Sequence, residues 1–370
     1  MHNYLSLTDL NSALAIPDLS TGPHAMSLLL DTVVDALESR WGVSAAIHRL
    51  NPLVATRDNY DRLGYASDDV TRESRYSRHI SPTVMLRSHT SAGIPALLDT
   101  LRTEQDRYDT LHVLPGLVYR RDAVDRTHVG TPHQVDLWRM KARGLLGAGD
   151  LLEMMGAVVD AVLPGARWRA TPATHSYTTA GQQLDVWVDG QWLELAECGL
   201  VAAPIMRGAG LDPRRWCGLA MGMGLDRALM LRKGVDDIRL LRSSDPRVVE
   251  QMSDLAPYRP VSAMPPMVRD LSLVCSSGVD VEVLGDAART ALGADAEVLA
   301  SLDVLALTAA GDLPAAAAAR LGIKAGQANV LVRLTLQSLE RTLTTAEANM
   351  VRDRVYTALH EGPVAELITG

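Results

Sequence analysis

Two arginine-bearing motifs carry the strongest chemical signal in this chain of 370 residues. The first runs from Gly116 to His128 and places Arg120, Asp122 and His128 on two expected strands joined by a charged loop. Arginine binds phosphate oxygens through a planar fork of donors. Asp122 falls on the same strand face as Arg120, because side chains alternate along a strand. This pattern indicates a polyphosphate-binding surface.

The second motif, Gly-Met-Gly-Leu-Asp-Arg, spans Gly222 to Arg227. Its glycines let the backbone approach a nucleotide closely, and the helix expected after them presents the arginine. Taken alone, an Arg-x-Asp pair in a strand is most often a surface salt bridge, and a lone Gly-x-Gly is weak. Together and in this order, the two motifs favour a nucleotide site.

The composition of the chain indicates the broad class of protein to which it belongs. The formal charge of −8 and the pI near 5.7 describe a soluble, mildly acidic protein without a basic tail for nucleic acid. Cys198, Cys217 and Cys275 lie far apart and predict reduced thiols without a metal site. No secretion signal or membrane-length apolar run occurs, so we expect a cytoplasmic protein.

The elements expected to hold the motifs make an α+β plan dominated by antiparallel strands. Apolar residues at helical spacing predict a helix over 24–41 that ends at Gly42. The polar, Tyr-containing segment 56–81 predicts a surface loop or flap. Further strands are expected at 45–48, 109–120, 132–139, 183–188 and 192–195, and further helices at 150–162 and 225–232.

A Pro-, Ser- and Tyr-containing stretch marks a linker. The sequence therefore predicts an irregular arm at 1–23, a domain at 24–253, the linker at 254–267 and a second domain at 268–370. In the second domain, strands are expected at 270–274, 298–307 and 329–337, helices at 281–292 and 344–360, and an Ala-rich turn or helix at 313–321. This alternation favours a β-α-β-β-α-β ferredoxin-like module.

The amino-acid sequences of the motifs resemble those of a known family. The two arginine motifs resemble motifs 2 and 3 of class II aminoacyl-tRNA synthetases. Leu86-Arg-Ser-His-Thr-Ser91 and Trp192-Leu-Glu-Leu195 are similar to the catalytic subunit of phenylalanyl-tRNA synthetase, and Arg269-Asp-Leu-Ser-Leu273 and Leu339-Glu-Arg-Thr-Leu-Thr-Thr345 resemble its ferredoxin-fold anticodon-binding domain. A catalytic core fused directly to that module resembles the single-chain organellar form.

The resemblance implies a class II antiparallel sheet flanked by helices and a two-step reaction with ATP and Mg²⁺. An amino acid would form an aminoacyl-adenylate, and the acyl group would then pass to tRNA. The region 24–52 would be the motif 1 dimer element, which keeps a full apolar stripe and favours a homodimer. The single-chain form implies a monomer instead.

The resemblance also assigns roles to individual residues. Arg120 would bind the α-phosphate and the amino-acid carboxylate, and Arg227 the γ-phosphate, stabilising charge in the in-line transition state. Around ATP it further implies His128 at the outer phosphates, Asp122 and Glu194 at adenine or Mg²⁺, and Pro132 in place of an adenine-stacking phenylalanine. Around the amino acid it implies His89, Ser91, Gln134, Asp136, Thr171, Ala173, Glu197 and Ala220.

The chain departs from the family at the substrate ring. It contains no phenylalanine, and the family's Phe-Pro-Phe-Thr stretch is replaced by Thr171-Pro172-Ala173-Thr174. Glu197 stands where the family carries glycine, and 176–181 resembles a short insertion. Two explanations stay open: phenylalanine was lost everywhere and these positions drifted, or the pocket was reshaped for another amino acid.

Two other functions remain open from the sequence. A biosynthetic paralogue would activate an amino acid for an acceptor other than tRNA, and the acidic balance of residues 258–370 leaves room for it. A non-catalytic tRNA-binding or regulatory protein is disfavoured, because Arg120 and Arg227 are both present.

Overall fold

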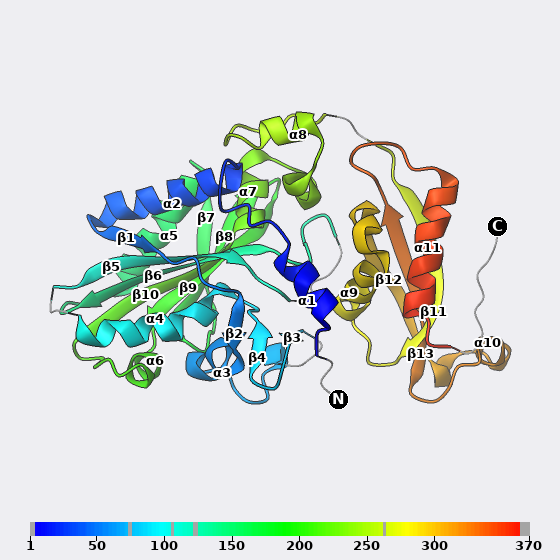
Figure 1. Cartoon of the computed structure of the whole chain (residues 1–370), viewed down its shortest axis with the longest axis horizontal. Coiled ribbons are helices and arrows are strands. Elements are labelled where there is room, and N and C mark those ends of the chain that lie inside the picture. The colour runs from blue at the N-terminus through cyan, green and yellow to red at the C-terminus, as the bar shows by residue number, and fades with distance from the viewer. Residues whose placement is uncertain (1–3, 73–75, 105–106, 121–124, 262–263, 363–370) are drawn as a thin grey trace. The chain divides into compact units, whose positions relative to one another are not determined.

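The computed structural model describes residues 4–72, 76–104, 107–120, 125–261 and 264–362. The chain divides into two compact units, which Figure 1 shows with their elements labelled. The first unit consists of Met1–Arg120, Thr131–Val235 and Glu250–Tyr258, and the second of Arg121–Gly130, Asp236–Val249 and Arg259–Gly370. Within the described ranges, no helix is long and apolar enough to cross a membrane.

A seven-stranded sheet forms the centre of the first unit, with the order β1-β5-β6-β10-β9-β8-β7 (Figure 1). Its strands are β1 (Ser44–Ile47), β5 (Asp109–Leu117), β6 (His133–Ala142), β7 (Trp168–Pro172), β8 (Thr178–Val188), β9 (Gln191–Val201) and β10 (Trp216–Gly224). β1 pairs with β5 in parallel, and the remaining pairs are antiparallel. The predicted α+β class is confirmed, with a mixed sheet.

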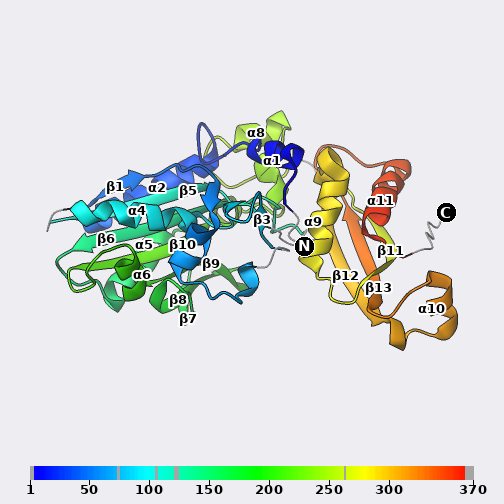
Figure 2. The ribbon, with the colours of Figure 1, turned by 60° about the horizontal axis from the view of Figure 1, so that its bottom comes forward.

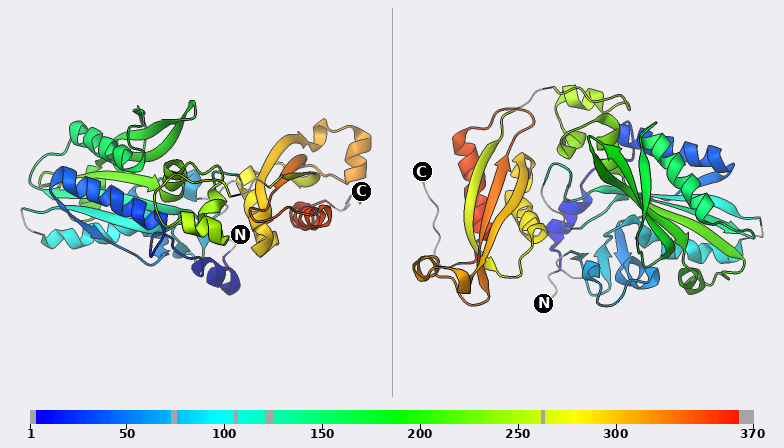
Figure 3. Two further views of the ribbon diagram at one scale, coloured as in Figure 1. Left: turned by 90° about the horizontal axis from the view of Figure 1, so that it is seen from above. Right: turned by 180° about the vertical axis from the view of Figure 1, so that it is seen from behind.

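Helices cover both faces of this sheet (Figures 1 and 3). α2 (Ala25–Trp41) and α5 (Ala148–Val162) pack together over one face, and α4 (Ile94–Thr100) and α6 (Ala203–Gly208) lie on the other. α7 (Leu225–Lys233) follows β10 directly. α2 confirms the helix predicted from its apolar spacing: His24 caps its start, and Gly42, with φ of 62°, ends it in the left-handed conformation.

Two segments carry more structure than their polar composition indicates. The arm expected to be irregular contains α1 (Leu7–Leu14), whose first turn is capped by Ser6, with 3.1 Å between the Ser6 hydroxyl and the Asp9 amide. The segment expected to be a loop holds α3 (Thr56–Asn59) and part of a small sheet of β2 (Leu53–Ala55), β4 (Val84–Leu86) and β3 (Arg78–His79). Pairing between strands separated in sequence forms this sheet, and hydrophobic spacing does not reveal such pairing.

The second unit contains a three-stranded antiparallel sheet of order β11-β13-β12 (Figure 2). Its elements are β11 (Met267–Ser276), α9 (Val281–Leu292), β12 (Leu299–Ala309), α10 (Ala315–Leu321), β13 (Gln327–Leu336) and α11 (Thr345–Leu359). α8 (Pro246–Gln251) precedes the expected linker, and only its first residues belong to this unit. Burial alternates along β13, and its buried side chains share one core with α9 and α11. Of the turn or helix expected for the Ala-rich run, the structure shows the helix, α10. A fourth strand of the predicted module is not among the described residues, which end soon after Glu361 donates to the carbonyl of Val274 at 2.8 Å.

Candidate active site

Residues predicted to surround the amino acid share one face of the seven-stranded sheet. Directly paired positions form a row across five neighbouring strands: Thr171, Gln183, Glu197, Gly222 and Asp136. Residues paired across antiparallel strands project to the same face. In the next row, Ala220 lies opposite Trp138. Strand register therefore brings Thr171, Glu197, Ala220 and Asp136 to one side of the sheet.

Asp136 is the buried carboxyl group at the centre of this face. Its carboxylate accepts hydrogen bonds from the hydroxyls of Thr90 (2.6 Å) and Ser91 (2.9 Å) and from the indole N–H of Trp138 (3.0 Å). Burial raises the pKa of Asp136, and these three donors oppose that shift. Ser91 was predicted from the sequence. Thr90 and Trp138 were missed, because the family resemblance implied a role for neither, although Thr90 directly precedes Ser91.

Two of the predicted amino-acid ligands present polar atoms that the protein does not satisfy. Both ring nitrogens of His89 and the Oε1 of Gln134 are shielded from water and have no hydrogen-bond partner among the described residues. Burial, with a smaller effect from Arg120, lowers the pKa of His89 to about 4, so this ring is neutral at physiological pH. A buried unsatisfied polar atom costs about 1–3 kcal/mol, so these atoms favour a polar ligand at this place.

Gly222 makes room for the Gln134 amide on the neighbouring strand. A Cβ at Gly222 would lie 3.3 Å from Nε2 of Gln134, which is shorter than most contacts that Cβ atoms make in proteins. The glycine-rich motif therefore leaves space on the sheet surface beside Gln134.

Aromatic rings stand beside these polar groups, and the sequence predicted none of them. The ring of Tyr65 stacks on His89 with 5.5 Å between centroids, and the ring of Tyr177 stacks on Trp138 at 5.8 Å. Ala173, at one of the two positions where the family carries phenylalanine, is half-buried, and its amide donates to the carbonyl of Gly181 at 2.9 Å.

The charged groups of the two arginine motifs meet near Glu194. Burial and the charge of Glu197 raise the pKa of Glu194, whereas Arg227 and Arg120 lower it. The carboxylate of Glu194 therefore lies within electrostatic range of both arginines. Arg120 follows β5 and is exposed, and Arg227 lies in the first turn of α7 and is half-buried. Asp122 lies outside the described residues.

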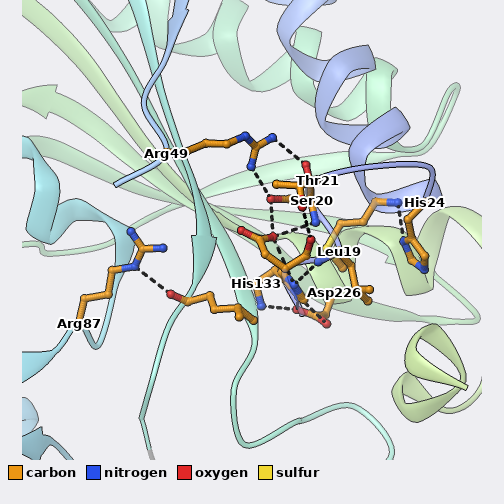
Figure 4. A network of polar contacts seen from close by, with 11 residues as sticks. Leu19, Ser20, Thr21, His24, Arg49, Arg87, His133 and Asp226 are labelled. Carbon is orange, nitrogen blue, oxygen red and sulfur yellow. Dashed lines mark hydrogen bonds and ion pairs between the residues drawn. The ribbon is translucent and has the colours of Figure 1, made fainter. Parts of the chain in front are cut away.

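A buried network holds the start of α7 against β6 (Figure 4). Asp226 accepts a hydrogen bond from the backbone N–H of His133, and its Oδ2 lies 3.2 Å from His133 Nδ1. The other ring nitrogen of His133 accepts from the Leu19 amide at 3.0 Å. Both ring nitrogens of His133 are thus engaged, and Asp226 ties the first turn of α7, which also carries Arg227, to β6.

The remaining predicted ATP residues lie in different units. The Pro132 carbonyl accepts from the Val118 amide at 2.9 Å in the first unit. His128 belongs to the second unit, where its Nδ1 lies 2.7 Å from Oδ2 of Asp125. Although burial acts in the opposite direction, hydrogen bonds from His128 and Thr127 lower the pKa of Asp125. The role of His128 at the outer phosphates stays a prediction.

The described residues are suited to bind ATP together with a metal ion that its phosphate oxygens already hold. In the described part of the chain, no three metal-ligating side chains gather into a cluster. Mg²⁺ in nucleotide sites keeps several waters and takes one or two carboxylates besides phosphate oxygens. The carboxylate of Glu194, close to Glu197 and to two arginines, is compatible with that mode of binding.

Comparison with known proteins agrees with this geometry. Residues 41–252 match the family of tRNA synthetases with a class II core domain (F). The mitochondrial phenylalanine–tRNA ligase of Saccharomyces cerevisiae is 25% identical over 91% of this chain and 86% of its own length. The chloroplastic/mitochondrial phenylalanine–tRNA ligase of Arabidopsis thaliana is 25% identical over 90% of this chain and 75% of its own length.

The alpha subunit of phenylalanine–tRNA ligase from Prochlorococcus marinus is 36% identical over 52% of this chain, which spans 56% of that subunit's length. The relatives named here give no support to the idea of a pocket reshaped for another amino acid. The family match covers more than half of the chain, including all seven strands of the mixed sheet. The chain therefore belongs to the tRNA synthetases with a class II core domain (F).

Proposed function

We propose that this protein is a phenylalanine–tRNA ligase, which activates phenylalanine with ATP and transfers it to tRNA. One observation carries the proposal: the unsatisfied polar atoms of His89 and Gln134 accompany the buried Asp136 on one sheet face, near the two motif arginines. The full-length relatives named above carry the same activity in their names.

The residues suggest a division of work in the first step. The substrate ammonium is held by Asp136, Ser91 and the Oε1 of Gln134, and Arg120 holds the substrate carboxylate beside the α-phosphate. A carboxylate oxygen then attacks the α-phosphorus in line, the phosphoanhydride bond breaks, and pyrophosphate leaves with the bonding electron pair. Fixing both reactants supplies much of the rate gain in such a reaction.

The arginines provide the electrostatic part of catalysis. Arg120 stabilises the negative charge on the α-phosphate oxygens, and Arg227 holds the γ-phosphate so that pyrophosphate leaves in line. Mg²⁺, when bound, would neutralise phosphate charge, and Glu194 is the described carboxylate best placed to hold it. Asp122 and His128 keep the phosphate and metal roles expected from the sequence.

The second unit is the proposed tRNA-binding part. α9 and α11 pack on one face of the three-stranded sheet, and the other face carries exposed side chains such as Arg333 and Asp270, which form an ion pair at 2.8 Å. A homodimer built through α2 remains part of the proposal, with a monomer as the alternative. The cytoplasmic location expected from the sequence likewise stays a prediction.

The test is amino-acid-dependent exchange of pyrophosphate into ATP, followed by aminoacylation of tRNA. The proposal expects exchange with phenylalanine above all other natural amino acids, and charging of a phenylalanine tRNA. Exchange without charging of any tRNA would instead indicate the biosynthetic paralogue. Absence of exchange with every amino acid would indicate a non-catalytic protein.

A further inference from the structure

We infer that Tyr177, on the turn between β7 and β8, is a specificity-determining residue whose ring forms the wall against the substrate side chain. The inference rests on the proposed function. Thr171 and Ala173, at the positions where the family carries ring-clamping phenylalanines, are small and half-buried. A phenyl ring bound beside them therefore needs apolar surface from another part of the chain.

The ring of Tyr177 lies on the amino-acid face of the sheet. It stacks on Trp138 with an interplanar angle of 25°, and it stacks on His175 with 6.2 Å between centroids. Trp138 in turn donates its indole N–H to Asp136. Burial raises the pKa of Tyr177 well above its ordinary value, and the nearby Asp136 adds to this shift. The neutral phenol therefore stands next to the carboxylate that would bind the substrate ammonium.

The turn that carries Tyr177 packs closely against its neighbours, because glycines stand at two positions where a side chain would collide with it. A Cβ at Gly199 would lie 2.7 Å from the Cβ of Thr178, and a Cβ at Gly181 would lie 2.5 Å from the carbonyl oxygen of Ala173. Neither position admits a larger residue without movement of the turn. The segment 176–181, which resembles a short insertion in the family, is thus a well-packed part of this site.

Polar contacts fix the turn on both sides of Tyr177. The Tyr177 carbonyl accepts from the Ala202 amide at 3.0 Å. His175 lies 3.1 Å from the Thr178 hydroxyl through Nδ1 and 3.3 Å from a Glu197 carboxylate oxygen through Nε2. These contacts hold the ring of Tyr177 in place before a substrate binds, so its surface is preorganised.

A second tyrosine adds ring surface on the same side. Tyr65 stacks on His89 at an interplanar angle of 21°, and burial together with Asp136 raises its pKa. Tyr65 and Tyr177 come from segments outside the arginine motifs, and both approach Asp136. An amino acid whose ammonium binds Asp136 would therefore meet aromatic surfaces, which suits an aromatic side chain.

The test measures KM for phenylalanine in pyrophosphate exchange with the full chain. Tyr177→Ala should raise this KM at least about tenfold, with a smaller change in kcat and no change in KM for ATP. Tyr177→Phe keeps the ring and should stay within about threefold of the unaltered protein. Adding Thr171→Phe and Ala173→Phe to Tyr177→Ala should recover much of the lost affinity.

Tyr108→Ala is the matched control, because Tyr108 packs on the same hydrophobic cluster as Tyr177 but stacks on His112 and Trp216. It should lower Tm without raising KM for phenylalanine. An unchanged KM in Tyr177→Ala would overturn the inference while leaving the proposed function intact. A lower KM would overturn it too, since Tyr177 would then obstruct the pocket. Lack of phenylalanine-dependent exchange in the unaltered chain would refute the proposed function and this inference with it.

Discussion

The Nε2 of His175 lies 3.3 Å from Oε2 of Glu197, on the sheet face that carries Asp136. The hydrogen bond from His175 lowers the pKa of Glu197 against the effect of burial. The Glu197 side chain is 45% exposed, so the pair contributes little to global stability. Its consequence is local: the lowered pKa favours the charged form of Glu197, which raises the pKa of Glu194.

Replacing Glu197 by glutamine should shift the pH dependence of pyrophosphate exchange. Burial raises the pKa of Glu194 most, and Glu197 adds to the shift. Without the Glu197 charge, the pKa of Glu194 falls and its anionic form persists to lower pH. The acid limb of the rate profile should therefore move to lower pH. Glu153→Gln, which breaks a surface ion pair with Arg40, is the control and should leave the profile in place.

Removing either motif arginine should nearly abolish adenylate formation. We expect Arg120→Ala and Arg227→Ala each to lower kcat/KM for exchange at least about a hundredfold, because fixed cations at developing phosphate charge are worth several kcal/mol. Arg120→Lys should recover only part of the loss, since lysine lacks the planar fork. Arg247→Ala, at an exposed ion pair with Asp245, should have no effect on the rate. Rates near the unaltered level in both motif variants would contradict the assigned roles.

Acid should destabilise the first unit through His112. Burial lowers the pKa of His112 to about 4, and its ring nitrogens contact His48 at 3.0 Å and the Tyr108 hydroxyl at 2.8 Å. The unfolded chain takes up a proton as pH falls below about 6.5, whereas the folded chain does not until about pH 4. The stability is complete above the unfolded pKa and is lost as pH falls through this window, by about 2 kcal/mol at pH 5.

Urea unfolding at pH 7 and pH 5 checks this prediction. All six tryptophans lie between Trp41 and Trp216, in the first unit, so their fluorescence reports on that unit alone. His112→Gln should lose less stability than the unaltered chain between the two pH values. An equal loss in both proteins would show that other groups cause the acid sensitivity.

Arg239 should control the order of the hairpin around Asp125 and His128. Its guanidinium donates to the carbonyls of Glu297 (2.7 Å) and Gln337 (3.1 Å), and the neighbouring Ile238 amide donates to the Arg126 carbonyl at 2.8 Å. All of these residues belong to the second unit.

In Arg239→Ala, backbone amides of residues 125–130 should exchange hydrogen faster, because charge-assisted bonds worth about 1–3 kcal/mol are lost. Arg341→Ala removes an exposed ion pair with Glu347 in the same unit and should leave exchange in this hairpin unchanged. Equal exchange in both variants would mean that Arg239 does not hold the hairpin.

Much of the fold and of the chemistry follows from local features of the sequence. The apolar spacing of 25–41 with Gly42, the two arginine motifs and the alternation in β13 each predict an element or a function from residues close together in the chain. Helix caps and strand faces depend on neighbours within a few positions, so composition and spacing suffice to find them. His89, Ser91 and Gln134 could be assigned because they belong to such short motifs.

Only the tertiary structure decided which rings and hydroxyls surround Asp136. Thr90, Trp138, Tyr65 and Tyr177 come from four separate segments, and only Trp138 lies on a strand; the other three lie in a short helix, a loop and a turn that pack beside Asp136. No spacing along the chain records that packing. The arginine chemistry is thus readable in the sequence, whereas the aromatic groups around Asp136 are brought together only by packing between segments that lie far apart in the chain.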